Sequence, residues 1–294
     1  MALVGTGELI AQARAAGHAV AAFNMITLEH AEAIAQGAEA AGAAAVLQVS
    51  ENAVKFHGGR LSAIAAAAGA VARASTASLS LHLDHVESVN LLYAAHPEGF
   101  SSVMFGASKL SYGENVKSTA AAVRWGHERG IWVEAELGKV GGKEGESPLD
   151  AHTPGVRTDP AEAAAYVAET GVDALAVAVG SSHAMTERTA VLDHELIARL
   201  RAALPVPLVL HGSSGVPDEE IRRAVAAGMT KINIGTALNT ACTGAVRAFL
   251  EANPTAVDPR KYLRPARDAM AETVAAFLAL LGSSGSSRPR GQGA

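Results

Sequence analysis

Short apolar runs alternate along this chain with longer alanine-rich segments in which apolar residues recur at helical spacing. This alternation is typical of βα units arranged around a parallel sheet. The run Ala174–Val179 is continuously apolar, as expected of a strand that is buried on both faces. Eight runs are predicted to be strands, each followed by a helix: His18–Phe23, Ala44–Val49, Ser78–Leu83, Ser101–Phe105, Trp132–Glu136, Ala174–Ala178, Leu208–Leu210 and Lys231–Ile234.

Eight βα units predict an α/β protein with a single (β/α)₈ TIM barrel, and the length of the chain allows one. The chain has 294 residues, whereas such a barrel takes roughly 250. We predict a barrel domain over residues 1–281 that includes an extra C-terminal helix near Arg260–Leu281. Residues 282–294 are rich in Gly, Ser and Arg and are predicted to be a disordered tail.

One long insertion interrupts the βα pattern at about residues 138–159. It is rich in glycine, contains several charges and shows no helical period. A loop of this length inside a compact domain is usually functional, so we predict a lid over the active site. A surface excursion without function is the alternative. Asp159-Pro160 then supplies the capping residue and first-turn proline of the next helix.

Composition and charge exclude several classes of protein. The formal net charge is −5 and no basic block precedes the tail, which argues against a nucleic-acid partner. No apolar run reaches the roughly 20 residues that cross a bilayer, and the N-terminus lacks the pattern of a signal peptide. Cys242 is the only cysteine, which excludes an internal disulfide. A cytoplasmic protein is therefore expected.

Polar residues that could carry chemistry follow the predicted strands. In this fold the active site forms at the C-terminal ends of the strands. The residues at these ends are Asn24, Ser50, Asp84, His85, Glu136, His183, His211, Gly212, Ser213, Ser214 and Asn233. Although they are far apart in sequence, we expect them to share one pocket.

Three of these residues are histidines, His85, His183 and His211, at the ends of strands three, six and seven. Three imidazoles with an open fourth position form a catalytic zinc site. His82, two residues before Asp84, is expected to have a structural role. The histidines on predicted helices or loops are expected to be surface residues: His30, His57, His96, His127, His152 and His194.

Asp84 adjoins the first of these histidines, and a carboxylate there is well placed to move a proton as a general acid or base. The alternative is that Asp84 only orients a ligand histidine. Two further segments, Gly212–Gly215 and Asn233–Thr236, follow strands seven and eight. Loops after these strands are the usual phosphate site of the barrel, so a phosphorylated substrate is predicted.

Five segments in order now show a family resemblance. They are Leu81–His85, Val133–Gly142, Val179–His183, Leu208–Gly215 and Lys231–Thr236, and the C-terminal Asp258–Leu263 and Pro265–Met270 continue the pattern. Together they resemble the class II fructose-bisphosphate and tagatose-bisphosphate aldolases, over nearly the whole chain up to about Gly282. The resemblance implies a phosphorylated ketose as substrate and a homodimer or homotetramer.

The resemblance also implies roles for individual residues. Zn²⁺ would be held by His85, His183 and His211, and Asp84 would transfer the proton. The substrate-binding residues would be Asn24, Ser50, Gly212, Ser213, Ser214, Asn233, Ile234, Gly235 and Thr236. In the lid, Glu144 matches an acidic residue that handles a second proton in such enzymes; an ordinary solvated loop charge is the alternative.

The resemblance implies a specific reaction. Zinc would polarise the ketose C2 carbonyl as a Lewis acid, Asp84 would remove the C4 hydroxyl proton, and the C3–C4 bond would break. A donor, with Glu144 as candidate, would then protonate C3. The other aldolase strategy needs a Schiff-base lysine. The sixth strand carries none, and Lys231 begins the eighth strand at the wrong end, so metal chemistry is favoured.

Departures from the family pattern bear on the substrate and on a second metal. Many relatives carry Asp at the position of Gly106, where it can hold a second metal with the residue that matches Glu136. Glu136 is therefore a candidate ligand for a second metal, which Gly106 puts in doubt. Ala184 replaces a frequent Gly, and Lys109 a frequent His.

Fructose 1,6-bisphosphate is the expected substrate. Tagatose 1,6-bisphosphate, another ketose phosphate, a non-catalytic sugar-phosphate sensor and a zinc hydrolase are the alternatives. Arg267 is a candidate for contact with a second phosphate.

Overall fold

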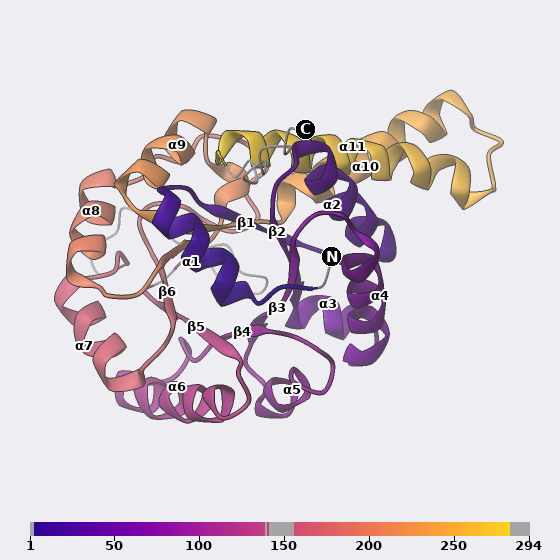
Figure 1. The fold of residues 1–294 in the computed structure, drawn as a ribbon. Coiled ribbons are helices and arrows are strands. Elements are labelled where there is room, and N and C mark those ends of the chain that lie inside the picture. Colours follow the sequence, from indigo (N-terminus) through magenta and orange to yellow (C-terminus); the bar gives the residue numbers. More distant parts are fainter. Residues whose placement is uncertain (1–2, 139, 141–155, 283–294) are drawn as a thin grey trace, which may run out of the picture.

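The structure, a computed structural model, describes residues 3–138, 140 and 156–282. Within these ranges eight parallel strands close into a barrel in the order β1 to β8, as the alternation of apolar runs predicts (Figure 1). The strands are β1 Val20–Asn24, β2 Ala45–Ser50, β3 Leu79–Val86, β4 Ser102–Phe105, β5 Trp132–Leu137, β6 Ala174–Val177, β7 Leu208–Leu210 and β8 Met229–Ile234. The fold is therefore a (β/α)₈ TIM barrel.

Helices surround this barrel on the outside (Figure 1). The helical elements are α1 Thr6–Ala16, α2 Leu28–Ala41, α3 Glu51–Phe56, α4 Leu61–Ala74, α5 Val89–Ala94, α6 Tyr112–His127, α7 Pro160–Thr170, α8 His194–Ala203, the 3₁₀ turn η1 Ser213–Gly215, α9 Asp218–Ala227, α10 Thr236–Ala252 and α11 Pro259–Leu280. The α7 helix begins as predicted, because the Asp159 carboxylate accepts hydrogen bonds from two first-turn N–H groups and Pro160 fills the first turn.

The interior of the barrel is apolar at its N-terminal end and polar further along its axis. At the N-terminal end α1 lies across the opening (Figure 1). Its Leu9 and Ile10 pack against Val20 and Val46, which close this end with apolar contacts. Further along the axis the interior is polar, and the side chains that point inward are completely buried: Gln48, His82, Glu134, His211 and Lys231. This polar layer carries the site described below.

Alternate strand residues point outward and form the main core between the strands and the helices. Phe23, Leu47, Ile232 and Ile234 belong to this layer and are fully buried. The alternation follows from the two-residue period of a strand, which sends neighbouring side chains to opposite faces. Inward-facing residues are thus free to carry chemistry, while their neighbours stabilise the barrel.

The strand β3 departs from this period at its C-terminal end. Its register with β4 shifts between Leu83 and Val86, as in a β-bulge. His85 has a φ of 90°, a conformation that a residue other than glycine rarely adopts. Such strain at a single position is frequent at functional sites.

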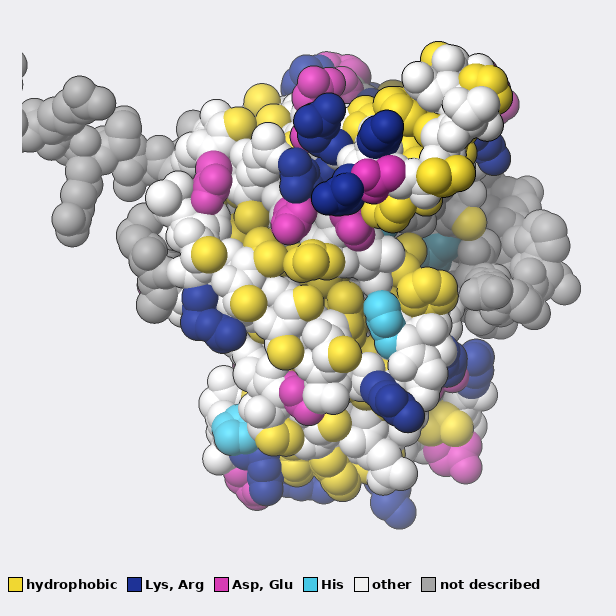
Figure 2. Space-filling model, turned by 90° about the vertical axis from the view of Figure 1, so that its right-hand side faces the viewer, with side chains coloured by type: hydrophobic (Ala, Val, Ile, Leu, Met, Phe, Trp, Pro, Cys, Tyr) yellow, Lys and Arg dark blue, Asp and Glu magenta, His cyan; other side chains and the backbone are white. Residues whose placement is uncertain are grey.

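The last two long helices, α10 and α11, lie side by side and project together from the barrel (Figure 1). The α11 helix also packs against α2 at close range, since a Cβ on Gly37 would lie 2.6 Å from the carbonyl oxygen of Ala271. Figure 2 shows the face that carries this projection, where acidic and basic side chains gather side by side in the upper part. No helix among the described residues is both long and apolar enough to span a bilayer.

Three expectations need comment. His30 is not a surface residue, because it is buried on α2 and its ring contacts Thr27 and Asn239. Most of the predicted lid and nearly all of the predicted tail lie outside the described residues. Where the loop is described it is anchored: the Thr158 hydroxyl donates to the Leu137 carbonyl at 2.6 Å and accepts from the Ala178 N–H at 2.9 Å.

Candidate metal and phosphate site

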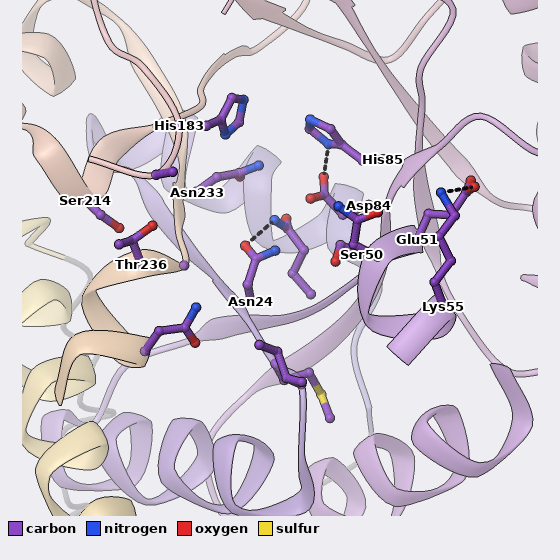
Figure 3. A pocket seen from close by; sticks show the side chains of 18 of the residues that line it. Asn24, Ser50, Glu51, Lys55, Asp84, His85, His183, Ser214, Asn233 and Thr236 are labelled. Atoms are coloured by element: carbon purple, nitrogen blue, oxygen red, sulfur yellow. Dashed lines mark hydrogen bonds and ion pairs between the residues drawn. The ribbon is translucent and has the colours of Figure 1, made fainter. Parts of the chain in front are cut away.

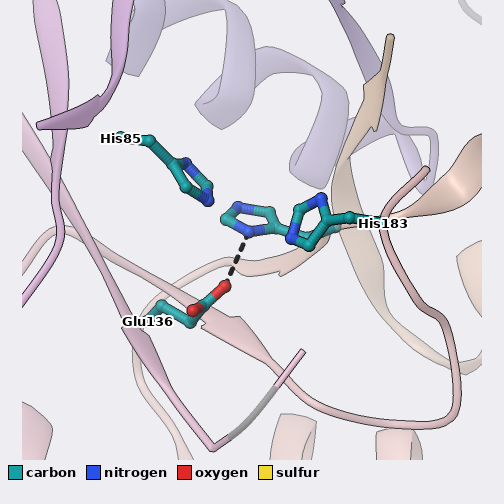
Figure 4. A group of neighbouring side chains, drawn as sticks. His85, Glu136 and His183 are labelled. Atoms are coloured by element: carbon teal, nitrogen blue, oxygen red, sulfur yellow. Dashed lines mark hydrogen bonds and ion pairs between the residues drawn. The ribbon is translucent and has the colours of Figure 1, made fainter. Parts of the chain in front are cut away.

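Four side chains with metal-binding atoms meet at the C-terminal end of the barrel. They are His85 from β3, Glu136 from β5, His183 from the segment after β6 and His211 directly after β7. One ligand atom of each lies within 4.8 Å of the others. Figure 4 shows the rings of His85 and His183 and the Glu136 carboxylate turned toward one another. The structure thus brings together the three histidines that the sequence singled out.

The donor atoms of this group fit a metal ion such as zinc. Imidazole nitrogens and a carboxylate oxygen are the ligands that zinc prefers besides thiolate. Nε2 of His85 is buried and has no hydrogen-bond partner within the described parts of the chain. A buried polar atom without a partner is costly, and a metal ion would satisfy it. The three ring centroids lie 4.8 to 5.7 Å apart, which leaves the rings in mutual contact.

Both nitrogens of His211 face carboxylates. Nδ1 lies 2.9 Å from Glu136 and Nε2 lies 3.0 Å from Glu134, with all three side chains buried. Burial acts to lower the pKa of His211, but hydrogen bonds to Glu134 and Glu136 outweigh it and raise the pKa to about 9. The ring is therefore held firmly by two residues of one strand, β5.

Asp84 lies beside the histidine group. Its carboxylate is 2.8 Å from Nδ1 of His85, and the residue is almost fully buried (Figure 3). Burial acts to raise the pKa of Asp84, but the charge of His85 and its hydrogen bond outweigh this effect and hold the pKa well below the usual range. Asp84 is thus an ionised carboxylate that can accept a proton at the edge of the site.

The two predicted phosphate segments lie together on the opposite side of the cavity (Figure 3). Gly212 adopts a left-handed φ of 68°, and a Cβ there would lie 2.5 Å from the Ser182 carbonyl oxygen. Only glycine fits this position. Ser214 accepts a hydrogen bond from the Ala237 N–H, which ties η1 to the first turn of α10. The N-terminus of α10, which begins at Thr236, favours an anion, because the first N–H groups of a helix have no acceptor within the helix and the positive end of its dipole lies there.

A single cavity of about 570 Å³ is lined by the two phosphate segments and by His85 and His183, whereas His211 and Glu136 of the metal-binding group do not line it. Its lining includes most of the residues that the sequence predicted: Asn24, Ser50, Asp84, His85, His183, Gly212, Ser214, Asn233, Gly235 and Thr236. The sequence argument missed further lining residues, among them Gln48, Glu51, Lys55, Glu87, Lys109 and Asn239. Gln48 precedes Ser50 by two residues, so the strand period could have found it.

Four of the predicted residues need separate mention. The Ser213 hydroxyl donates to the Leu210 carbonyl, and the Ile234 side chain packs in the outer core, so neither side chain lines the cavity. Glu136 belongs to the same group as the histidines, whereas Gly106 lines a separate pocket with Phe105. Glu144 lies outside the described residues.

Ala184 stands where relatives often carry glycine, and its backbone conformation is one that favours glycine. It follows His183 with a left-handed φ of 57°, a conformation in which glycine is free of strain. Ala184 lines the cavity, as do Ser182 and Gly212. The backbone is therefore strained at Ala184, next to His183.

Comparison with known proteins shows the family of this chain. A family model described as "Fructose-bisphosphate aldolase class-II" matches residues 4–286. The YdjI aldolase of Escherichia coli K12 is 31% identical, with a TM-score of 0.83 over 97% of this chain and 100% of that one. A putative fructose-1,6-biphosphate aldolase of Coccidioides immitis is 28% identical, with a TM-score of 0.83 over 95% and 96%.

A third structure shows the fold alone. The fructose-bisphosphate aldolase of Campylobacter jejuni is 22% identical, with a TM-score of 0.82 over 96% of each chain. With the family match, these likenesses identify the protein as a lyase built on a (β/α)₈ barrel. More narrowly, the chain belongs to the class II fructose-bisphosphate aldolase family.

Proposed function

We propose that this protein catalyses the reversible, zinc-dependent cleavage of a ketose 1,6-bisphosphate, with fructose 1,6-bisphosphate as the substrate. The products are dihydroxyacetone phosphate and glyceraldehyde 3-phosphate. One observation carries this proposal: two histidines of the metal-binding group, the Asp84 carboxylate and the N-terminus of α10 line one cavity. Metal-dependent cleavage of a phosphorylated ketose uses all three.

The residues that would hold the metal are His85, His183 and His211, with Glu136 within reach of the same ion. When bound, zinc supplies Lewis acidity toward the C2 carbonyl and its neighbouring hydroxyl. The histidines are held in place by the protein itself. Asp84 fixes His85, and the Ser181 hydroxyl donates to the His211 carbonyl at 2.6 Å.

The remaining side chains would bind the substrate and move protons. Gly212, Ser214 and Thr236 surround the phosphate at the α10 terminus, which sets the position of C2 relative to the histidines. Asp84 removes the proton of the C4 hydroxyl, because an ionised carboxylate at the cavity wall can act as a general base. Asn233, whose side chain lines the cavity, donates to the oxygen on which negative charge develops.

Glu144 is the proposed donor that protonates C3 after the bond breaks. This role rests on the resemblance and on its place in the predicted lid. Replacing Glu144 by Gln should lower the cleavage rate by about 10²-fold or more, the usual contribution of a proton donor. Glu146→Gln, two residues away in the same segment, is the matched control and should cleave normally. Equal rates in the two variants would remove Glu144 from the mechanism.

The decisive experiment measures cleavage of fructose and tagatose 1,6-bisphosphates by coupled detection of triose phosphate. The two sugars differ only at C4, so the ratio of kcat/KM identifies the preferred configuration. Metal-free protein should be inactive and should recover on addition of one equivalent of zinc. Cleavage that survives complete metal removal contradicts zinc dependence. Zinc-loaded protein that binds either sugar but cleaves neither is a sensor rather than an aldolase.

A further inference from the structure

A continuous series of buried side chains crosses the barrel beneath the metal-binding group. Nε2 of His211 contacts Glu134 at 3.0 Å, and the other carboxylate oxygen of Glu134 lies 2.8 Å from Nζ of Lys231. Nζ of Lys231 in turn donates to Gln48 at 3.1 Å. Gln48 donates from Nε2 to Oδ1 of Asn24 at 2.9 Å. Four strands, β5, β8, β2 and β1, and the residue directly after β7 therefore contribute to one hydrogen-bonded series.

Burial of the central pair of this series, Lys231 and Glu134, costs free energy. Lys231 and Glu134 are both 0% exposed, and each charge loses its hydration on folding. Replacement of such a pair by apolar residues is often neutral or stabilising, so a buried pair is weak evidence for a role in stability alone. Glu134 does not belong to the metal-binding group, and Lys231 does not line the cavity. Neither residue has a part in the chemistry proposed above.

The series affects the site through the residues at its two ends, His211 and Asn24. An ionised carboxylate beside a lysine can only accept hydrogen bonds, so Nε2 of His211 must donate to Glu134. Nδ1 meets the carboxylate of Glu136, a member of the metal-binding group, so a bound metal would take the place of the proton between these two atoms. At the far end, Oδ1 of Asn24 accepts from Gln48, so its amide NH₂ is left to donate into the cavity that it lines.

We propose that Glu134, Lys231 and Gln48 form a positioning network that orients His211 to bind metal through Nδ1 and orients the Asn24 amide toward the substrate. This inference rests on the proposed function. The network is rigid because Lys231 holds two oxygens from different strands, β5 and β2. Residues that orient a ligand histidine contribute strongly to metal binding although they never touch the metal.

The first test needs no variant. In a crystal structure of the zinc-loaded protein, Nδ1 of His211 should bind the metal while Nε2 remains hydrogen-bonded to Glu134. Coordination through Nε2, or a Glu134 that has left His211 for the metal, overturns the proposal. Absence of zinc at the four side chains would instead contradict the proposed function, so the two failures are distinguishable.

The second test uses variants and zinc affinity, measured by competition with a chromophoric chelator. Glu134→Gln and Lys231→Met should each weaken zinc binding by about 10- to 100-fold, the usual effect of removing such a partner. Each single change leaves one buried charge without its partner and therefore lowers stability. The double variant Glu134→Gln/Lys231→Met restores charge balance while keeping similar side-chain volumes, and should fold with weakened zinc binding.

Ile232→Ala is the matched control. Ile232 is equally buried and adjoins Lys231 on β8, but it belongs to the outer core. This variant should lower the melting temperature and leave the zinc dissociation constant unchanged. The Glu134 and Lys231 variants should also raise KM for the ketose through Asn24. A folded double variant with wild-type zinc affinity and wild-type KM overturns the positioning role.

Discussion

The Asp84 carboxylate lies 2.8 Å from Nδ1 of His85, the residue that follows it in β3. In a regular strand two consecutive side chains point to opposite faces and cannot meet in one cavity. Here the register shift at the end of β3 and the positive φ of His85 turn both side chains toward the site. The strain of one residue thus places a general base and a metal ligand side by side.

This pairing predicts the behaviour of Asp84→Asn. The amide keeps the size of the side chain and can still accept a hydrogen bond from His85, but it cannot take up a proton. Zinc content should stay near the wild-type value, while cleavage should fall by about 10²- to 10⁴-fold. Metal analysis alongside steady-state kinetics provides the check. Loss of zinc together with activity would assign Asp84 to the orientation of His85 instead.

The metal-binding group predicts which histidines hold zinc. His183→Ala and His211→Ala should each bind much less than one equivalent of zinc and should show no zinc-restored cleavage, because each removes one of three imidazoles. His127→Ala is the control, since His127 is half exposed on α6 and contacts Asp173. Its zinc content, measured by atomic emission, should equal that of the wild type. Full zinc occupancy in His211→Ala would refute the proposed ligand set.

The variants Gly212→Ala and Gly113→Ala should differ in stability and in KM. Gly212→Ala places a Cβ against the Ser182 backbone in a left-handed conformation, so it should cost at least about 1 kcal/mol of stability and raise KM for a phosphorylated ketose. Gly113→Ala on α6 meets open space and should be neutral or stabilising by up to about 1 kcal/mol. Denaturant titration and KM measurements compare the two. Equal KM values would place the phosphate elsewhere.

A buried tyrosine predicts a loss of stability at high pH. Burial raises the pKa of Tyr166 to about 12, and its hydroxyl donates to Oδ1 of Asn115 at 2.7 Å and lies 3.0 Å from the Thr119 hydroxyl. Between pH 10 and 12 the unfolded chain loses this proton while the folded protein keeps it, so the free energy of unfolding falls as pH rises. The two-unit difference corresponds to about 3 kcal/mol at most.

Tyr166→Phe removes this contribution and serves as the comparison. The variant should be less stable than the wild type near pH 8, because Asn115 and Thr119 lose a partner. From pH 10 upward its free energy of unfolding should decline less steeply than that of the wild type. Parallel pH profiles from denaturant titration would show that Tyr166 does not contribute to the alkaline loss of stability.

The sequence predicted the barrel well because short runs typical of strands alternate with longer segments of helical period along the chain. Boundaries of predicted strands agree with the structure to within two residues, except that β3 ends at Val86, three residues beyond the predicted Leu83, and Leu208–Leu210 agrees at both ends. The Asp159-Pro160 cap was also predictable, since it depends on neighbouring residues alone. His30 was misjudged because its burial depends on Asn239, a contact more than 200 positions away.

By itself, the sequence determined which chemical groups stand at the strand ends: the histidines, Asp84 and the glycine–serine turn after β7. Only the tertiary structure decided how they meet. Closure of the barrel brings Lys231 of β8 against Glu134 of β5, and the bulge in β3 turns Asp84 and His85 the same way. Likewise, the packing of η1 turns the Ser213 hydroxyl away from the cavity. Periodicity assigns a residue to a face, whereas distances across a closed barrel depend on how all eight strands pack.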